Sequence, residues 1–180
     1  MTSAVIVAAG SSRRLGFDKL TVELAGIPVL TRSLLAFQKC DVIDRIVVVT
    51  SEERFEWVHE QAEGRAITKL LSVVTGSTER HLSVKCGLDA LPAETEIVAV
   101  HDGARPLVTS EAIAQCVERA GSTGAASLAH RVADTLKRAD DQQSVIESVS
   151  RENLWGMETP QVFQMPLLRR AYQKIIEAGD

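Results

Sequence analysis

The chain has 180 residues, of which 45% are hydrophobic and 24% are charged, as is typical of a globular domain with a sizeable core. Its net charge of -4 argues against a general binder of nucleic acid or of anionic membranes. No apolar stretch approaches the ~20 residues of a membrane span, and the first residues lack the pattern of a signal peptide. The cysteines are odd in number, far apart and without a CxxC motif. We therefore expect buried thiols in a cytoplasmic protein, not disulfides or metal ligands, at Cys40, Cys86 and Cys116.

Four short apolar runs predict strands, and helix-like stretches separate them. The first run shows no alternation of polar and apolar residues, which suits a strand buried on both faces of a parallel sheet. The predicted strands are 4–9, 46–50, 71–74 and 97–100. The predicted helices are 28–40, 53–63, 81–91 and 110–120, the last with Thr109 or Ser110 as its N-cap. This alternation predicts an α/β fold with a mainly parallel central sheet.

Residues 127–150 interrupt this alternation. They predict two strands around a polar turn at 139–143. A hairpin inserted into an α/β fold has little core to fill, so we expect an arm that contacts a substrate or a second subunit. We therefore interpret residues 1–180 as a single domain with an arm at about 127–150.

Polar loops follow three of the predicted strands. They are residues 10–19, the segment TGSTERHLS at 75–83 and the segment HDGARP at 101–106. Ligands of open α/β sheets bind outside the carboxyl ends of the strands. We therefore expect the three loops to converge on one polar, partly cationic site.

The loop after the first strand carries glycine, serines and three cations. Its spacing is not that of a Walker P-loop, and Ser12 replaces the second glycine of the dinucleotide fingerprint. Backbone N–H groups in such a turn nevertheless bind anionic oxygens. Arg14 and Lys19 could neutralise charge during phosphoryl or nucleotidyl transfer. The alternative, that Arg13 and Arg14 are merely solvated, stays open.

The loop after the fourth strand admits two interpretations. Asp102 could bind a sugar hydroxyl or position a Mg²⁺–phosphate complex, or it could cap the turn and pair with Arg105. We expect His101 to support the strand end and not to act as a general base. The remaining histidines show no metal-ligand spacing, so no zinc site is expected at His59, His81 and His130.

Two later segments also carry polar residues in a functional pattern. DTLKR (134–138) places cations on the predicted arm, and SRENLWGMETPQVF (150–163) precedes a final helix. Within the second segment, Arg151 and Thr159 bracket an apolar patch, which suits a small anionic group such as a phosphate monoester.

Five segments, in this order, closely resemble the 2-C-methyl-D-erythritol 4-phosphate cytidylyltransferase family: VAAGSSRRLGFDKL, RHLSVKCGL, VHDGARPLV, DTLKR and RENLWGMETPQVF. The first motif is shared by many nucleotidyltransferases, whereas the ordered set is specific and covers nearly the whole chain. The resemblance implies a Rossmann-like nucleotidyltransferase fold and a homodimer built through the arm. It also implies transfer of CMP from CTP to methylerythritol 4-phosphate with release of diphosphate. The Mg²⁺ ion would be held mainly by the CTP phosphates, with no protein metal site.

The resemblance also implies roles for individual residues. The transition state would be stabilised by Arg14 and Lys19. The ribose and phosphates of CTP would be held by Ala8, Ala9 and Gly10, and its cytosine by Gly76 and Ser83. The methylerythritol hydroxyls would be bound by Asp102 and Arg105, and its phosphate by Thr135, Thr159 and the catalytic Arg151, with arm residues reaching across the dimer.

Two alternatives remain open at this stage. A cytidylyltransferase for another polyol phosphate, such as ribitol 5-phosphate, would share the fold and the chemistry. The sequence also ends at Asp180, before the segment in which the family carries a lysine for the substrate phosphate. A chain that lacks this lysine could be a non-catalytic nucleotide-binding homologue, but the other site residues are in place, so we expect an omitted tail.

Overall fold

The computed structural model of the chain describes residues 1–10 and 16–178. Its strands are β1 (Thr2–Val7), β2 (Glu23–Leu24), β3 (Ile27–Pro28), β4 (Arg45–Thr50), β5 (Leu70–Thr75), β6 (Ile97–Asp102), β7 (Ala125–Arg131), β8 (Leu136–Ala139), β9 (Val145–Val149) and β10 (Trp155–Gln164). Its helices are α1 (Val29–Lys39), the 3₁₀ turn η1 (Glu52–Arg54), α2 (Phe55–Glu63), α3 (Arg80–Asp89), α4 (Ser110–Thr123) and α5 (Met165–Ala178). All four predicted strands and all four predicted helices are present, with bounds shifted by a few residues.

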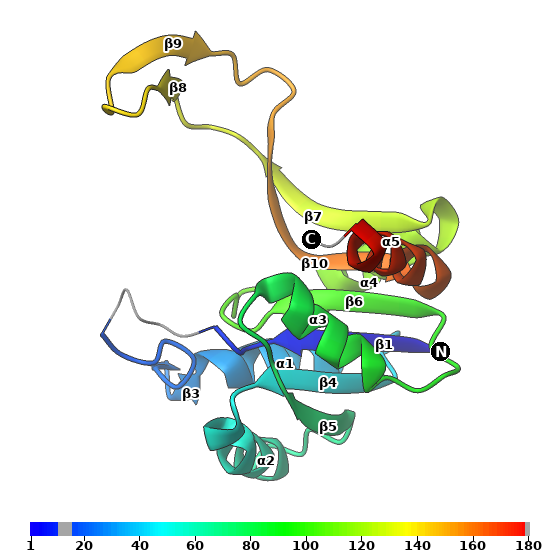
Figure 1. The fold of residues 1–180 in the computed structure, drawn as a ribbon. Coiled ribbons are helices and arrows are strands. Elements are labelled where there is room, and N and C mark those ends of the chain that lie inside the picture. Colours follow the sequence, from blue (N-terminus) through cyan, green and yellow to red (C-terminus); the bar gives the residue numbers. More distant parts are fainter. Residues whose placement is uncertain (11–15, 179–180) are drawn as a thin grey trace.

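One sheet organises the fold, with strand order β5-β4-β1-β6-β10-β7 (Figure 1). β5, β4, β1 and β6 are parallel, whereas β10 is antiparallel to both β6 and β7. The mainly parallel α/β fold is therefore confirmed. β10 was not predicted as a strand, because Glu158, Thr159 and Pro160 interrupt its apolar pattern.

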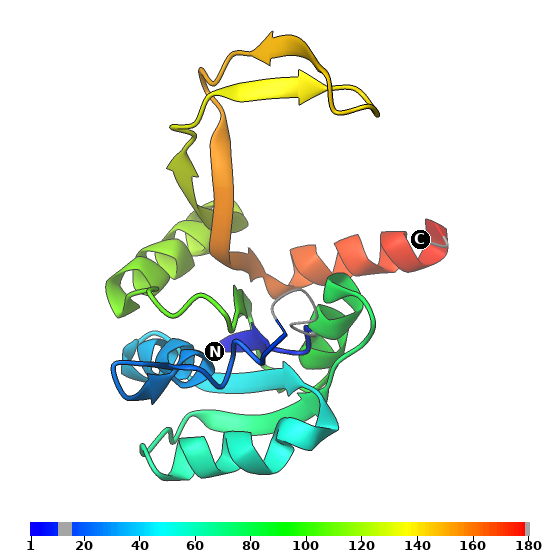
Figure 2. The same cartoon turned by 90° about the vertical axis from the view of Figure 1, so that its left-hand side faces the viewer.

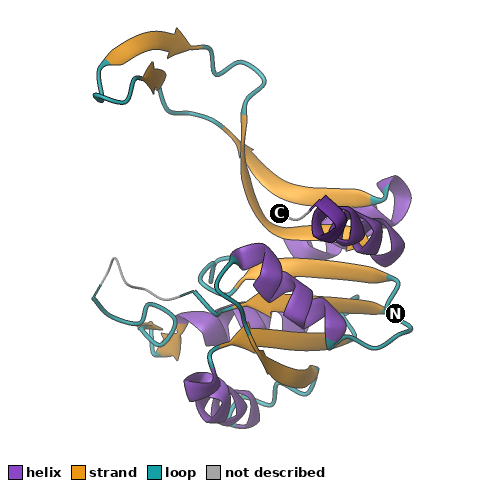
Figure 3. Ribbon diagram, viewed as in Figure 1, coloured by secondary structure: helices purple, strands orange, loops and turns teal. Residues whose placement is uncertain are grey.

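Helices cover both faces of this sheet (Figure 3). Along β1, Ala4 and Ile6 pack in one core with α1, α2 and α4, while Val5 packs in the other with α3 and α5. This division explains why β1 is continuously apolar from Ala4 to Val7, since both faces of the strand are covered. The sheet therefore presents its functional groups at the strand ends and not on a face.

The ends of α4 follow from two residues of the sequence. Thr109 is the N-cap, and its Oγ1 accepts a hydrogen bond from the N–H of Ala112 at 3.2 Å, as the sequence predicted. Gly124 ends the helix with φ +89°, a conformation that favours glycine. The chain can then turn back at once into β7.

A hairpin of β8 and β9 projects from the sheet as an arm (Figure 2). It is shorter than the predicted 127–150, because residues 125–131 form β7 within the main sheet. The two strands of the hairpin are residues 136–139 and 145–149, and the polar turn lies between them. The arm carries exposed apolar side chains, with Val145 65% and Ile146 60% exposed.

The three cysteines are thiols, as the sequence predicted. All three thiols are free, with Cys40 and Cys116 buried and Cys86 half-buried. Burial raises the pKa of the Cys40 and Cys116 thiols.

None of the helices in the described part of the chain combines the length and apolarity that crossing a membrane requires.

The contact between α3 and the sheet generates a stability prediction. A Cβ added at Gly87 would lie 2.4 Å from Cγ1 of Val5 and 2.8 Å from Cγ2 of Val49, and neither branched side chain can move aside. We expect Gly87→Ala to lower the free energy of unfolding by about 1–3 kcal/mol. The matched change Gly121→Ala, where the nearest atom is Ile97 Cδ1 at 3.7 Å, should stabilise α4 by up to about 1 kcal/mol. Urea unfolding measures both, and an unchanged midpoint for Gly87→Ala would contradict this packing.

Candidate active site

A cleft of about 840 Å³ lies where the polar loops after β1, β5 and β6 meet. This convergence was predicted from the three strand ends and is confirmed. The size suits a nucleotide-like ligand. The described residues that line it are Val7, Ala8, Ala9, Gly10, Lys19, Leu20, Ser77, Thr78, Glu79, Arg80, Ser83, Asp102, Ala104 and Arg105.

Backbone hydrogen bonds beyond the strand ends build the floor of this cleft. The N–H of Ala8 donates to the carbonyl of Val49 at 2.7 Å, and the N–H of Gly76 donates to that of Thr50 at 2.9 Å. A Cβ on Gly76 would lie only 2.3 Å from the Cβ of Ala9. Glycine at this position therefore allows the loop after β5 to lie directly against the loop after β1.

Ser83 fixes the loop that leads into α3. Its hydroxyl accepts a hydrogen bond from the N–H of Ser77 at 2.9 Å and donates one to the Ser77 carbonyl at 3.1 Å. The Ser83 side chain is buried behind this loop, although it reaches the cleft wall. Its hydroxyl thus fixes the backbone of a loop that lines the cleft.

Asp102 lies between two arginines at the opposite wall. Arg80 donates to Oδ1 at 2.9–3.0 Å, and Nε of Arg105 lies 3.3 Å from Oδ2. The pairing of Asp102 with Arg105, one of the two interpretations that the sequence left open, is therefore present. Arg80 was not predicted as a site residue, although it belongs to the polar segment 75–83. Its position at the start of α3, directly after the polar loop, was the available signal.

Buried polar groups connect Asp102 to β10. The N–H of Asp102 donates to Oγ1 of Thr159 at 3.2 Å, and Oγ1 lies 2.9 Å from Nδ1 of His101. Nε2 of His101 lies 3.2 Å from the carbonyl of Arg105. Because a carbonyl oxygen only accepts, Nε2 carries the imidazole proton, and Nδ1 accepts the proton of Thr159. His101 thus supports the strand end, as the sequence predicted.

His101 is fully buried and packs on the ring of Phe37, with 5.1 Å between the ring centroids. Burial lowers the pKa of His101 to about 4, because the charged imidazolium would lose its hydration. The ring is therefore neutral near pH 7, in agreement with the hydrogen bonds around it.

The first loop places Lys19 in the cleft wall. Asp18, directly before it, forms an ion pair with Arg54, with 2.7 Å between Oδ2 and Nε. The other cation predicted for catalysis, Arg14, lies outside the described residues, as do Arg13 and Ser12. Of the two cations predicted to stabilise the transition state, the structure thus positions Lys19, whereas the third predicted catalytic cation, Arg151, lies on the arm.

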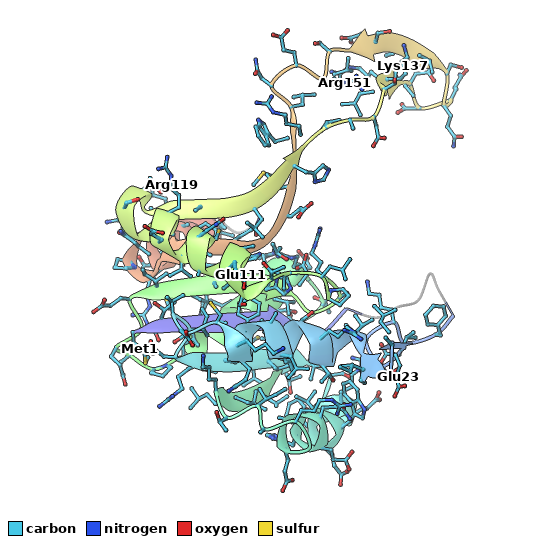
Figure 4. All side chains as sticks on the ribbon, turned by 180° about the vertical axis from the view of Figure 1, so that it is seen from behind. Met1, Glu23, Glu111, Arg119, Lys137 and Arg151 are labelled. Carbon is cyan, nitrogen blue, oxygen red and sulfur yellow. The ribbon has the colours of Figure 1, made fainter. Side chains whose placement is uncertain are left out.

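The predicted phosphate-binding residues are divided between two places. Thr159 lies beside the cleft, whereas Thr135 and Arg151 are exposed near the base of the arm. Arg151 and Lys137 lie on the arm, far from the main sheet of their own chain (Figure 4). Nη1 of Arg151 donates to the carbonyl of Ala133, which links the segment before β8 to the segment after β9. One chain therefore does not bring Thr135 and Arg151 to the cleft.

His101 generates a prediction about pH. The pKa of His101 is about 4 in the folded chain and about 6.5 when unfolded, so between these values only the unfolded chain binds the proton. Its contribution to stability is complete above pH ~6.5 and is lost as the pH falls toward ~4. Between pH 7.5 and 4.5, wild type should lose about 2–3 kcal/mol more unfolding free energy than His101→Gln.

Chemical denaturation at a series of pH values measures this difference. The exposed His59 provides the control, and His59→Gln should keep the wild-type pH dependence. Parallel curves for wild type and His101→Gln would show that His101 is not buried as the neutral form.

Comparison with known proteins identifies the family. The family model IspD, 2-C-methyl-D-erythritol 4-phosphate cytidylyltransferase, matches residues 2–180. Enzymes of this name from Caldanaerobacter subterraneus and Halalkalibacterium halodurans are each 41% identical to the chain, over 98% and 96% of it and 79% and 75% of their own lengths. The solved 4-diphosphocytidyl-2C-methyl-D-erythritol synthase of Anaerococcus prevotii superimposes with a TM-score of 0.85 at 30% identity, over 98% of this chain and 75% of that one. The cytidylyltransferase of Thermus thermophilus gives a TM-score of 0.75 at 29% identity, over 100% and 79%. The ordered motifs, the fold and these relatives agree, and the chain belongs to the 2-C-methyl-D-erythritol 4-phosphate cytidylyltransferase family.

Proposed function

We propose that the chain transfers the cytidylyl group of CTP to 2-C-methyl-D-erythritol 4-phosphate and releases diphosphate. The observation that carries this proposal is the convergence of Lys19 with the backbone of Ala8–Gly10 in one cleft, in a chain of this family. A phosphate oxygen of the acceptor attacks the α-phosphorus of CTP, and the bond from that phosphorus to the diphosphate oxygen breaks. No protein nucleophile is needed, so the protein acts by positioning and charge neutralisation.

Lys19 supplies positive charge where the reaction needs it. Negative charge accumulates on the α-phosphate oxygens and the departing diphosphate during the transfer. An ammonium group in the cleft wall stabilises that charge more than the charge of bound CTP. We assign the same role to Arg14.

The nucleotide occupies the side of the cleft formed by the loops after β1 and β5. Ala8, Ala9 and Gly10 hold the ribose and phosphates, because their small side chains let the ligand approach the backbone. The cytosine lies beside Gly76 and the loop braced by Ser83. This placement agrees with the close contact of Gly76 and Ala9.

The acceptor occupies the side formed by Asp102 and Arg105. Arg105 also lines a second hollow of about 460 Å³, whose wall includes Thr159. The junction of the two hollows would bring the acceptor phosphate beside the nucleotide. Because the hydroxyl proton of Thr159 is used by His101, Thr159 would accept a hydrogen bond from a polyol hydroxyl or hold Asp102 in place.

The residues of the cleft fit a Mg²⁺ ion carried by the nucleotide. Within residues 1–10 and 16–178, no group of three His, Cys, Asp or Glu side chains is placed to hold a metal. Asp102 is paired with two arginines, and Glu79 lies 3.3 Å from His81 Nδ1. Mg²⁺ prefers substrate phosphates together with one or two carboxylates, and both carboxylates of the described cleft wall are already paired, so we assign the ion mainly to the CTP phosphates. When bound, the ion would neutralise phosphate charge.

The arm contributes to the site of a second copy. Arg151 lies on it, far from the main sheet of its own chain, and Thr135 directly precedes β8, so neither lines the cleft, although a phosphorylated acceptor needs cations. Exposed apolar side chains on and near the arm would be covered by a partner: Val145, Ile146, Trp155 and Met157. We therefore propose a homodimer in which Arg151 of each chain binds the acceptor phosphate in its partner's cleft.

Substitution of Lys19 tests the chemical step. Lys19→Ala should lower kcat by roughly 10²-fold or more with little loss of CTP binding, because one transition-state contact is removed. Lys39→Ala, at the exposed end of α1, is the matched control and should keep wild-type turnover. Wild-type turnover of Lys19→Ala would contradict the assignment.

Diphosphate release from CTP and Mg²⁺ measures that rate and also tests the substrate. Methylerythritol 4-phosphate and ribitol 5-phosphate are supplied as separate acceptors. Release with the first acceptor alone supports the proposed function. Release with the second alone, or with neither, would overturn it.

Mixed dimers test whether the site is shared. In a dimer of Lys19→Ala with Arg151→Ala, one cleft meets both substitutions and the other meets neither. Doubly tagged mixed dimers should therefore regain about half of the wild-type turnover per dimer, whereas each parent stays impaired. Mixed dimers no more active than their parents would show that Arg151 serves its own chain or no site at all.

A further inference from the structure

The turn that carries Lys19 is closed by the residue directly before it. Oδ1 of Asp18 accepts the N–H of Leu20 at 3.1 Å, and its carbonyl accepts both the N–H and the hydroxyl of Thr21, at 3.2 and 3.0 Å. Leu20 is buried, and its carbonyl accepts the N–H of Leu30 at 3.1 Å. Lys19 thus lies between two anchored residues, although its turn belongs to no regular element.

Arg54 attaches this turn to the end of β4. Its Nε donates to Oδ2 of Asp18 at 2.7 Å, and its Nη1 lies 3.1 Å from the hydroxyl of Ser51 and 3.4 Å from that of Thr50. The Thr50 hydroxyl in turn donates to the carbonyl of Ala8 at 3.2 Å. A continuous series of polar contacts therefore runs from the turn to the backbone that lines the cleft.

The pair is shielded enough to hold a defined geometry. The side chains of Arg54 and Asp18 are 18% and 30% exposed, whereas those of the hairpin pair Arg138–Glu147 are 62% and 58% exposed. Fully exposed pairs contribute little because water and salt screen them, and partly buried pairs are screened less. Arg54 also balances the carboxylate that lies next to Lys19 in the sequence.

We propose that Arg54 and Asp18 are positioning residues for Lys19. They hold its turn against the carboxyl end of β4 and thereby fix the ammonium group where charge develops in the transfer. This inference rests on the function proposed above, and neither residue is assigned a contact with substrate. A misplacement of about 1 Å can cost roughly 10²-fold in rate, so support of this kind has a measurable effect.

A double-substitution cycle tests the proposal. kcat and the KM for CTP are measured for wild type, Arg54→Met, Lys19→Ala and the double variant. Arg54→Met alone should lower kcat about 10- to 100-fold and change the KM for CTP less than about threefold. In the Lys19→Ala background, Arg54→Met should lower kcat by no more than about a further twofold, because Arg54 acts through Lys19.

Three further variants complete the design. Arg54→Lys keeps the charge but cannot donate from two separate nitrogens, as Nε and Nη1 of Arg54 do, so it should recover part of kcat. Asp18→Asn keeps an acceptor for Leu20 but loses the charge, and it replaces Arg54→Met in the cycle if that variant fails to fold. Arg45→Met is the matched control at the other end of β4, where Arg45 donates to the carbonyl of Asp44, and it should leave kcat unchanged.

The outcomes separate the two proposals. Equal losses from Arg54→Met with and without Lys19 would overturn the positioning role while leaving the proposed function intact. A wild-type chain that releases no diphosphate from CTP would overturn the proposed function, and the positioning role with it. A loss of kcat that Arg54→Met causes only in chains that retain Lys19 supports both.

Discussion

Parallel pairing of β5, β4, β1 and β6 is the constraint on which the site depends. The pairing continues past the strand ends, where Ala8 donates to Val49, Gly76 to Thr50 and Gly103 to Val7, at 2.7 to 2.9 Å. These bonds hold three loops from distant parts of the sequence against one another. The backbone beside the small residues Ala8, Ala9 and Gly10 therefore forms part of the cleft wall, next to the side chains of Lys19 and Arg80. Such a surface suits phosphate and ribose, which backbone N–H groups and close approach both favour.

The second support is a polar one inside an otherwise apolar core. Thr159 comes from β10, which is antiparallel to the neighbouring β6, and its hydroxyl joins the N–H of Asp102 to the ring of His101. Every polar atom in this group has a partner, so burial costs little and the geometry is defined. β10 thus holds the backbone of Asp102, and two arginines hold its carboxylate. Its position is set before any ligand binds.

Local patterns in the sequence predicted the parallel strands, the helices and the three loops of the site, since each has a local cause. Val47 to Val49 is a continuous apolar run, and Thr109 precedes an acidic residue and an apolar stretch. Contacts between distant segments left no such pattern. The pairing of Asp18 with Arg54 joins residues 36 positions apart, and β10 is interrupted by polar residues that serve the site. Arg80 is part of the segment RHLSVKCGL, but only the fold places it against Asp102.

The arm links the fold to the chemistry in a different way. A two-stranded hairpin is marginally stable alone, and in the described part of the chain β8 and β9 pair only with each other. Bracing by Arg151 against the Ala133 carbonyl, and the cation–π contact of Arg131 with Trp155 at 4.7 Å, stiffen its base but leave Val145 and Ile146 in water. A partner that covered these side chains would order the arm and deliver its cations at the same time. Among the described residues, the cleft of one chain offers the acceptor phosphate only the cations Lys19, Arg80 and Arg105. In the proposed homodimer, assembly and acceptor binding would therefore become one requirement.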